Sequence, residues 1–162
     1  MNKNAKWIYS PKNKDNRVIT FSKKINLLGE VKKATLYASA IGLYFAEING
    51  KRVSDAVFTP GWTTGNVHTQ YQKYDVTKML TSKKAELSLT AGKGWALGYL
   101  TWNEWNNLYA DHMSVIAALE VTYKDGTKES FCTDETWSVH TSHIIDSEIY
   151  HGETDDLTAD II

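Results

Sequence analysis

Apolar and polar residues alternate along several short stretches of the chain, and this alternation predicts β-strands. The clearest stretch runs from Ala85 to Ala91, where small or apolar residues occupy the odd positions and polar residues stand between them. Residues 115–123 also have apolar odd positions, but the even positions Ile116 and Ala118 are apolar as well. We therefore expect the first strand to bury one face, and the second to begin buried on both faces and end half-exposed.

Two Asx-Gly pairs predict hairpins. Asn49-Gly50 and Asp125-Gly126 suit the positive φ angles of tight primed turns. They join the predicted strands 43–48 to 51–53 and 115–123 to 128–132. We expect further strands at 18–25, 33–40, 137–140 and 147–150, and one helical turn at 75–80 with Asp75 as its cap.

This series of short strands predicts an all-β sandwich or barrel. The chain has 162 residues, about the length of one domain, and its apolar fraction of 42% is ordinary for a globular protein. We therefore expect residues 1–162 to form a single domain.

Charge and hydropathy exclude several classes of partner. The 18 basic and 19 acidic residues give a net charge of −1, which offers no electrostatic reason to expect a nucleic-acid partner. No run of about 18 apolar residues indicates a membrane span, and no apolar segment follows the N-terminal lysines as in a secretory signal. We expect a cytoplasmic protein, in which Cys132 is a small core residue rather than a nucleophile.

No recognisable catalytic motif is present. Residues 91–95 contain two glycines but lack phosphate-loop spacing, and His140 and His143 lack a third metal ligand. The nearest approach to a pair of glycosidase carboxylates is an acidic group near the chain end: Glu153, Asp155, Asp156 and Asp160. We interpret this group as a solvated acidic tail, and we expect a domain with no catalytic residues and no required cofactor.

One long segment between predicted strands, residues 94–111, concentrates aromatic and amide side chains. Aromatic faces stack on the apolar faces of sugars, and long loops in compact domains are often functional. The candidate sugar-binding residues are Trp95, Trp102, Asn103, Trp105, Asn106 and Tyr109. In the alternative interpretation, these aromatic residues pack the loop onto the sandwich or onto a neighbouring domain.

Calcium is a candidate ligand of the same segment. Ca²⁺ takes six to eight oxygen ligands and accepts vicinal sugar hydroxyls among them. Asp111, at the end of the segment, and Asp55, after the Asn49-Gly50 hairpin, are the candidate metal-binding residues. For Asp55, the alternative is a hydrogen bond within its own loop.

An ordered set of phrases resembles the N-terminal domain of bacterial α-L-rhamnosidases over most of the chain, from Trp7 to Asp156. Among these phrases are Glu-Ile-Asn-Gly-Lys-Arg-Val-Ser-Asp at 47–55, Thr-Pro-Gly-Trp-Thr at 59–63 and Thr-Asp-Glu-Thr-Trp at 133–137. The others lie at 34–44, 71–77, 92–95 and 149–154. The chain departs from the family at residues 155–158, where it has Asp-Asp-Leu-Thr and the family tends to have Tyr-Asp-Ala-Arg.

The resemblance implies a jelly-roll β-sandwich like the galactose-binding domains. In that family the domain precedes further β domains and an α/α barrel, whose carboxylates hydrolyse terminal α-L-rhamnose with inversion. No barrel is present here, so the resemblance assigns no catalytic residue to this chain. It implies instead a part of a larger rhamnosidase, with residues 153–162 linking to downstream domains.

Two functions remain open. In the first, the domain supports the downstream catalytic domain and also binds L-rhamnose or a related sugar, with or without calcium. In the second, it is purely a structural domain that docks onto its neighbours and binds no ligand. Exposed side chains at Trp102 and Trp105 would favour the first function, and buried ones would favour the second.

Overall fold

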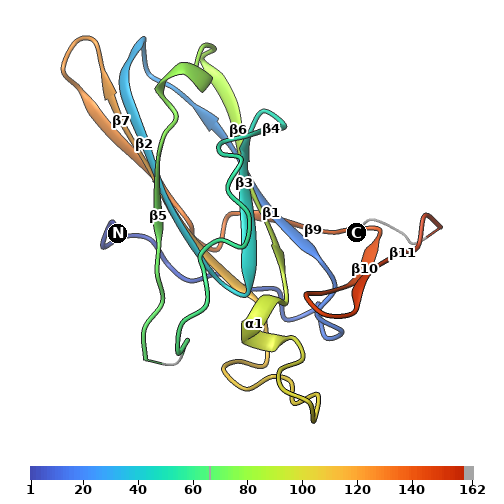
Figure 1. Cartoon of the computed structure of the whole chain (residues 1–162). Helices are drawn as coiled ribbons and strands as arrows, with labels where there is room; N and C mark the ends of the chain where they lie inside the picture. The colour runs from blue at the N-terminus through green and yellow to red at the C-terminus, as the bar shows by residue number, and fades with distance from the viewer. Residues whose placement is uncertain (66, 159–162) are drawn as a thin grey trace.

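The computed structural model describes residues 1–65 and 67–158, and antiparallel strands dominate it (Figure 1). The strands are β1 (Ile19–Asn26), β2 (Val31–Ile41), β3 (Leu43–Ile48), β4 (Lys51–Arg52), β5 (Gln72–Asp75), β6 (Lys84–Gly92), β7 (Ser114–Tyr123), β8 (Lys128–Cys132), β9 (Ser138–Thr141), β10 (Ile144–Glu148) and β11 (Gly152–Asp155). The helical elements are the 3-10 turn η1 (Thr77–Met79) and the short helix α1 (Gly94–Leu97).

The strands form two main sheets. One has five strands in the order β4-β3-β6-β1-β9, and the other has four in the order β5-β2-β7-β8. The strands β10 and β11 make a separate antiparallel pair. The expected all-β jelly-roll sandwich is confirmed.

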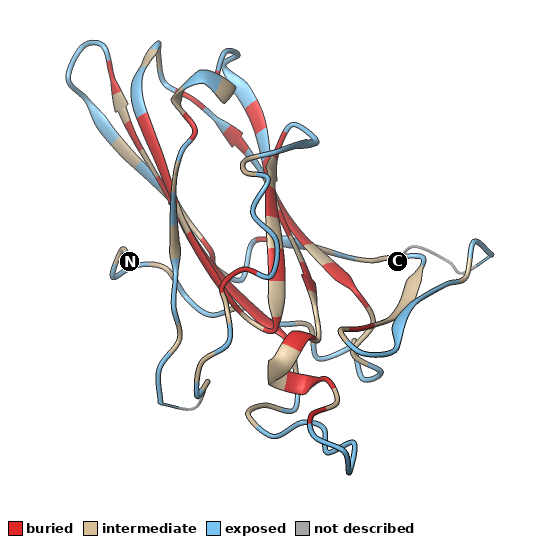
Figure 2. Ribbon diagram, in the orientation of Figure 1, coloured by how far each residue is buried: buried red, intermediate tan, exposed pale blue. Residues whose placement is uncertain are grey.

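The hydrophobic core lies between the two main sheets, as the buried stripes along the strands show (Figure 2). Along β6, every second residue from Ala85 to Ala91 is buried, as the alternation predicts. Phe21 on β1 and Leu89 on β6 come from one sheet, and Leu36 on β2 comes from the other. Burial of these side chains supplies the main free energy that stabilises the fold.

The strand β7 is buried on both faces at its start. All six residues of 114–119 are buried, and burial then alternates to Tyr123, which confirms the prediction for this strand. Beyond the end of β8, the N-terminal segment continues the sheet, because Ile8 and Val115 exchange two backbone hydrogen bonds of 2.9 Å each. This N-terminal pairing had no sequence signal.

Both Asx-Gly hairpins form, but only Asn49-Gly50 has the positive φ angles expected at both positions; at Asp125-Gly126 the positive φ is confined to the glycine, and the N–H of Gly126 donates to the carbonyl of Tyr123 at 3.0 Å. Asn49 and Gly50 have φ angles of 52° and 72°, and Gly126 has 90°. The helical turn predicted at 75–80 is the shorter element η1, and its N-cap is Val76 rather than the predicted Asp75. Asp75 lies one residue earlier, where its Oδ1 accepts the N–H of Thr77 at 3.0 Å.

Two predictions need correction, and one strand was missed. The strand predicted at 147–150 is β10, which lies earlier at 144–148, and the polar strand β5 was not predicted. Cys132 is half-buried at the end of β8 and lies outside the core, although burial raises the pKa of its thiol and disfavours the thiolate.

The end of the chain differs from a plain linker. Residues 153–155, at the start of the predicted linker 153–162, belong to the strand β11, which pairs with β10. Residues 159–162, including Asp160, lie outside the described residues, and the linking role stays a prediction. No helix in the described part of the chain is long and apolar enough to cross a membrane.

Candidate functional site

Two segments far apart in sequence meet at one end of the sandwich. The first is α1 with the loop that follows it, and the second is the turn between β10 and β11 (Figure 1). The ring centroids of Tyr99 and His151 lie 4.9 Å apart, and His151 Nε2 lies 3.4 Å from Glu104 Oε1. These contacts bring the loop and the turn together into one site.

The two segments border a cleft of about 420 Å³ that is open to solvent. Its lining residues are Tyr99, Thr101, Trp102, Glu104, Tyr150 and His151, and we call it the aromatic cleft. The volume lies within the range of small-molecule sites. The side chain of Trp102 is fully exposed, with a relative accessibility of 102%.

A tight turn holds Trp102 at the rim of this cleft. Leu100 and Trp105 exchange backbone hydrogen bonds of 2.7 Å and 3.0 Å, which close the chain on both sides of Trp102. Thr101 and Glu104 have positive φ angles of 66° and 53°, as the sharp turn requires. The site is therefore an ordered turn of the backbone, anchored by the buried side chain of Leu100.

The segment predicted as a long loop is tied down along its length. It begins with the helix α1, and the N–H of Asn107 donates to the carbonyl of Leu97 at 3.1 Å. The N–H of Tyr109 donates to the carbonyl of Ala96 at 3.3 Å. The backbone thus folds back onto α1 after presenting Trp102.

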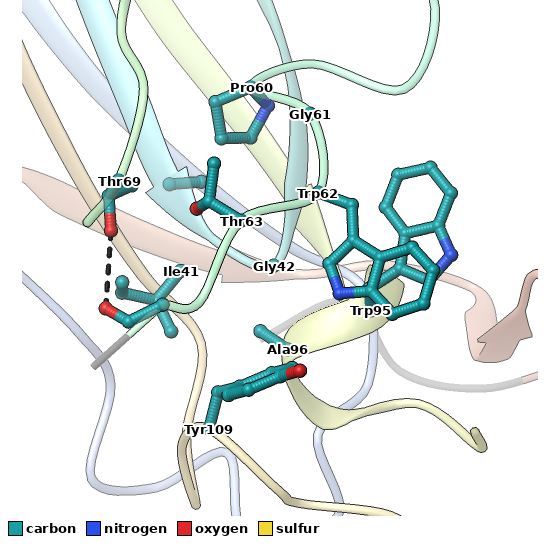
Figure 3. Close-up of a pocket in the computed structure, with 12 residues that line it drawn as sticks. Ile41, Gly42, Pro60, Gly61, Trp62, Thr63, Thr69, Trp95, Ala96 and Tyr109 are labelled. Atoms are coloured by element: carbon teal, nitrogen blue, oxygen red, sulfur yellow. Dashed lines mark hydrogen bonds between the residues drawn. The ribbon is translucent and has the colours of Figure 1, made fainter. Parts of the chain in front are cut away.

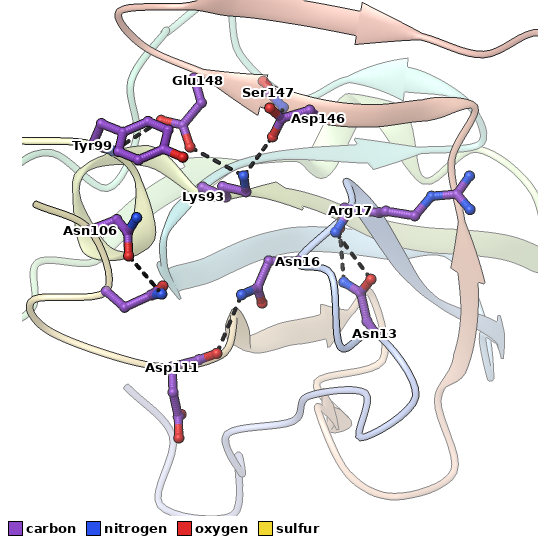
Figure 4. A network of polar contacts seen from close by, with 11 residues as sticks. Asn13, Asn16, Arg17, Lys93, Tyr99, Asn106, Asp111, Asp146, Ser147 and Glu148 are labelled. Carbon is purple, nitrogen blue, oxygen red and sulfur yellow. Dashed lines mark hydrogen bonds and ion pairs between the residues drawn. The ribbon is translucent and has the colours of Figure 1, made fainter. Parts of the chain in front are cut away.

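A group of charged residues joins α1 to the strand β10 (Figure 4). Lys93 Nζ lies 2.5 Å from Asp146 Oδ1 and 3.2 Å from Glu148 Oε1. Burial disfavours the Lys93 ammonium, but its hydrogen bonds to Asp146 and Glu148 together outweigh burial and raise the pKa of Lys93. Lys93 is therefore charged at neutral pH, and it fixes the hairpin of β10 and β11 against the sandwich.

The predicted residues Trp95 and Tyr109 lie in a different place, a small hollow shown in Figure 3. The ring of Trp95 stacks on that of Trp62, with centroids 5.7 Å apart and planes inclined by 5°. Phe58 lies 5.6 Å from Trp95 on the same surface. We call Phe58, Trp62 and Trp95 the aromatic triplet; it is separate from the set of residues that line the aromatic cleft.

Of the six predicted sugar-binding residues, Trp102 lines the aromatic cleft. Asn103, Trp105 and Asn106 are exposed beside it in the chain, and Asn106 Oδ1 accepts a 3.0 Å hydrogen bond from Asn107. The cleft residues Tyr150 and His151 were not predicted as site residues. Their sequence signals are the family phrase at 149–154, in which both residues stand, and their place just before Gly152, which has a φ of 85° in the turn that begins β11.

The candidate calcium ligands lie apart from the aromatic cleft lining. The carboxylate of Asp111 pairs with the ring of His112, and Asp55 is exposed in the segment after β4. Within residues 1–65 and 67–158, no three His, Cys, Asp or Glu side chains group in a way that could hold a metal ion. The calcium hypothesis stays a prediction from the sequence.

Comparison with known proteins identifies relatives along most of the chain. The family model for the α-L-rhamnosidase N-terminal domain matches residues 29–161. An α-L-rhamnosidase of Formosa agariphila is 34% identical over 94% of this chain, and one of Streptomyces avermitilis is 35% identical over 78% of it. These matches cover only 18% and 12% of the two relatives, so the chain spans less than a fifth of their length.

Solved structures agree with the sequence comparisons. The α-L-rhamnosidase of Aspergillus terreus superimposes with a TM-score of 0.90 at 35% identity, over 95% of this chain and 18% of that one. The Streptomyces avermitilis enzyme, solved in complex with L-rhamnose, gives 0.82 at 32% identity, over 86% and 14%. A lectin of Pleurotus ostreatus shares the fold alone, with a TM-score of 0.57 at 18% identity over 86% and 35%. The chain belongs to the family of α-L-rhamnosidase N-terminal domains.

Proposed function

We propose that this chain is a non-catalytic accessory domain of an α-L-rhamnosidase-like glycoside hydrolase, and that its aromatic cleft binds L-rhamnose or a related sugar. The observation that carries the proposal is the fully exposed Trp102 at the rim of a cleft that also contains Tyr99 and Tyr150. Exposed apolar side chains that gather in one patch mark interaction sites and ligand-binding grooves. Trp102 gathers in this way with Tyr99 and the exposed Tyr150.

The chemistry of the cleft suits a deoxy sugar. L-Rhamnose has a methyl group and C–H faces, which pack on aromatic rings, and vicinal hydroxyls, which need polar partners. Glu104 accepts hydrogen bonds from hydroxyls, and His151 can donate or accept one. These two side chains contact each other at the same end of the cleft.

The proposal assigns hydrolysis to another part of the parent enzyme. Among the described residues that line the aromatic cleft, Glu104 is the only carboxylate, whereas an inverting glycosidase uses two. The parent enzyme would hydrolyse terminal α-L-rhamnosides with inversion in a downstream catalytic domain, which this domain supports. The solved complex of the Streptomyces avermitilis relative with L-rhamnose supports the choice of sugar. We retain the cytoplasm as the proposed location.

A second candidate function, interdomain docking, is favoured by the aromatic triplet. The side chains of Phe58 and Trp62 are more than half exposed and pack only partly against Trp95. An ordered apolar cluster outside the aromatic cleft suits contact with another domain of the parent enzyme. The two functions are compatible, because they use different side chains.

Calorimetric titration of the domain with L-rhamnose, in calcium and in chelator, tests the sugar-binding function. We expect saturable heat from the unaltered domain, and at least about tenfold weaker binding after Trp102→Ala, a loss of about 1.4 kcal/mol. Trp62→Ala, an exposed tryptophan outside the aromatic cleft, is the matched control and should bind as the unaltered domain does. Heat that disappears with chelator would support calcium in the site.

An absence of heat at millimolar L-rhamnose in both conditions would reject sugar binding and leave docking as the function. Equal weakening by Trp62→Ala and Trp102→Ala would place the sugar outside the aromatic cleft.

A further inference from the structure

We propose that Glu148 is a positioning residue of the aromatic cleft, which holds the two walls of the cleft at their binding distance. The role in sugar affinity rests on the function proposed above, whereas the role in geometry can be tested without a ligand. Glu148 itself does not line the cleft.

The two walls of the aromatic cleft come from separate segments of the chain. Tyr99, Trp102 and Glu104 come from the segment after α1, and Tyr150 and His151 come from the turn after β10. The contact between Glu104 and His151 is exposed and joins them only weakly, since even charged exposed pairs stabilise by about 0–1 kcal/mol. The rings of Tyr99 and His151 also contact each other, with centroids 4.9 Å apart, but both contacts join side chains and leave the connection to the backbone to another residue.

Glu148 is the last residue of β10 and supplies that connection (Figure 4). Its Oε2 accepts the N–H of Tyr99 at 3.1 Å, and its Oε1 lies 3.2 Å from Lys93 Nζ. Lys93 directly precedes α1 and Tyr99 follows it, so one carboxylate holds both ends of the helix. Tyr150 and His151 follow Glu148 in the chain, and the same residue therefore places the other wall.

Burial of the Glu148 carboxylate strengthens its preference for the arrangement in which its contacts are made. The side chain of Glu148 is only 3% exposed, and both of its oxygens have partners. A buried carboxylate that loses its partners is strongly disfavoured, so the native arrangement is the one in which both contacts are made. The carboxylate therefore has a holding role, because it is buried and does not line the aromatic cleft.

Gly98 allows the close approach that the contact requires. A Cβ atom at this position would lie 2.6 Å from Glu148 Oε2. The absence of a side chain lets the carboxylate reach the backbone beyond it at Tyr99.

The test uses two variants that separate positioning from stability. Lys93→Met with Glu148→Leu removes both contacts without leaving a buried charge, and such apolar replacements usually preserve stability. Glu148→Gln keeps an oxygen that can accept the Tyr99 N–H. Glu153→Gln, an exposed carboxylate on β11, is the matched control.

Amide hydrogen exchange and NMR shifts report the geometry, and titration with L-rhamnose reports the affinity. In the double variant we expect native protection in β2 and β7, at least about tenfold faster exchange at Tyr99, and shifted ring signals of His151. We expect about tenfold weaker L-rhamnose binding in this variant. Glu148→Gln should retain the protection of Tyr99, and Glu153→Gln should match the unaltered domain.

The proposal is overturned if the double variant keeps the Tyr99 protection and the His151 signals, or if it binds L-rhamnose as the unaltered domain does. If the unaltered domain binds no L-rhamnose, the proposed function fails, and exchange at Tyr99 alone decides the positioning role. A change in Tyr99 with no change in affinity would confine Glu148 to a purely structural role and also reject the proposal.

Discussion

Gly98 lies at the end of α1, where the backbone passes against Glu148. Its φ of −70° is open to any residue, so the constraint is space: an added Cβ would lie 2.4 Å from the carbonyl oxygen of Gly94. We expect Gly98→Ala to lower the free energy of unfolding by about 1–3 kcal/mol, because overpacking forces the carboxylate and the helix apart. Urea unfolding at neutral pH measures this loss.

Gly29 is the matched control for this substitution. A Cβ atom there would have Tyr123 Cδ1 as its nearest neighbour at 4.0 Å, which is ordinary contact. Gly29→Ala should change the free energy of unfolding by no more than about 0.5 kcal/mol. Equal losses at the two glycines would show that the close approach at Glu148 does not set the cost.

Individual tryptophans show what sequence could not resolve at this scale. Trp62 and Trp137 both stand in family phrases, and each could be a core residue or a surface platform. Trp137 is buried and its Nε1 donates to the carbonyl of Cys132 at 2.9 Å, whereas Trp62 is exposed in the aromatic triplet. The residues that flank each tryptophan in the sequence do not distinguish the two cases, because burial depends on which distant strand or loop covers the ring.

The N-terminal segment and the end of β8 are joined through Thr133, which is fully buried. Its hydroxyl donates to the carbonyl of Lys6 at 2.6 Å and accepts the N–H of Ala117 at 3.1 Å. Thr133→Val keeps the shape but leaves both backbone groups without this partner, so we expect a loss of about 1–3 kcal/mol. Thermal unfolding measures the loss, and faster amide exchange at Lys6 and Ile8 should accompany it.

Thr122→Val, at a half-exposed position of β7, is the control for the loss of a threonine hydroxyl. Its stability should lie within about 0.5 kcal/mol of the unaltered domain. Unchanged exchange at Lys6 after Thr133→Val would mean that the N-terminal segment is held by other contacts.

Strands with one buried face were predictable, and strands that depend on their neighbours were not. β6 alternates strictly, and the hairpin of β7 and β8 is marked by Asp125-Gly126. By contrast, β5 is a short edge strand of mostly polar residues that pairs only with β2 in the described sheet. All four residues of β11 are exposed, so its pairing with β10 left no hydrophobic pattern to find.

The candidate site was predictable from one side only. The aromatic segment 94–111 stands out by composition, and the side chain of its Trp102 is fully exposed in the structure. The opposite wall, Tyr150 and His151, meets it through a contact between distant segments, which spacing along the chain cannot reveal. The position of Trp95 against Trp62 was hidden for the same reason.

At the scale of the whole molecule, both main sheets share one core. Leu119 on β7 is fully buried, paired in register with Leu36 on β2 and Phe131 on β8. We expect Leu119→Ala to cost about 2–5 kcal/mol, out of the about 5–15 kcal/mol that stabilises a typical domain. The melting temperature should fall by about 2–4 °C for each kcal/mol lost, and urea unfolding measures the change directly.

The same variant tests whether the chain is one cooperative domain. If the sheets unfold together, Leu119→Ala should accelerate exchange in β1 and β6 as strongly as in β2 and β7, because every strand then depends on the same core. Leu28→Ala, at an exposed leucine outside the strands, should leave exchange and stability nearly unchanged. Loss of exchange protection confined to β2, β7 and β8, with native protection in the five-stranded sheet, would instead mean that the two sheets are separate folding units.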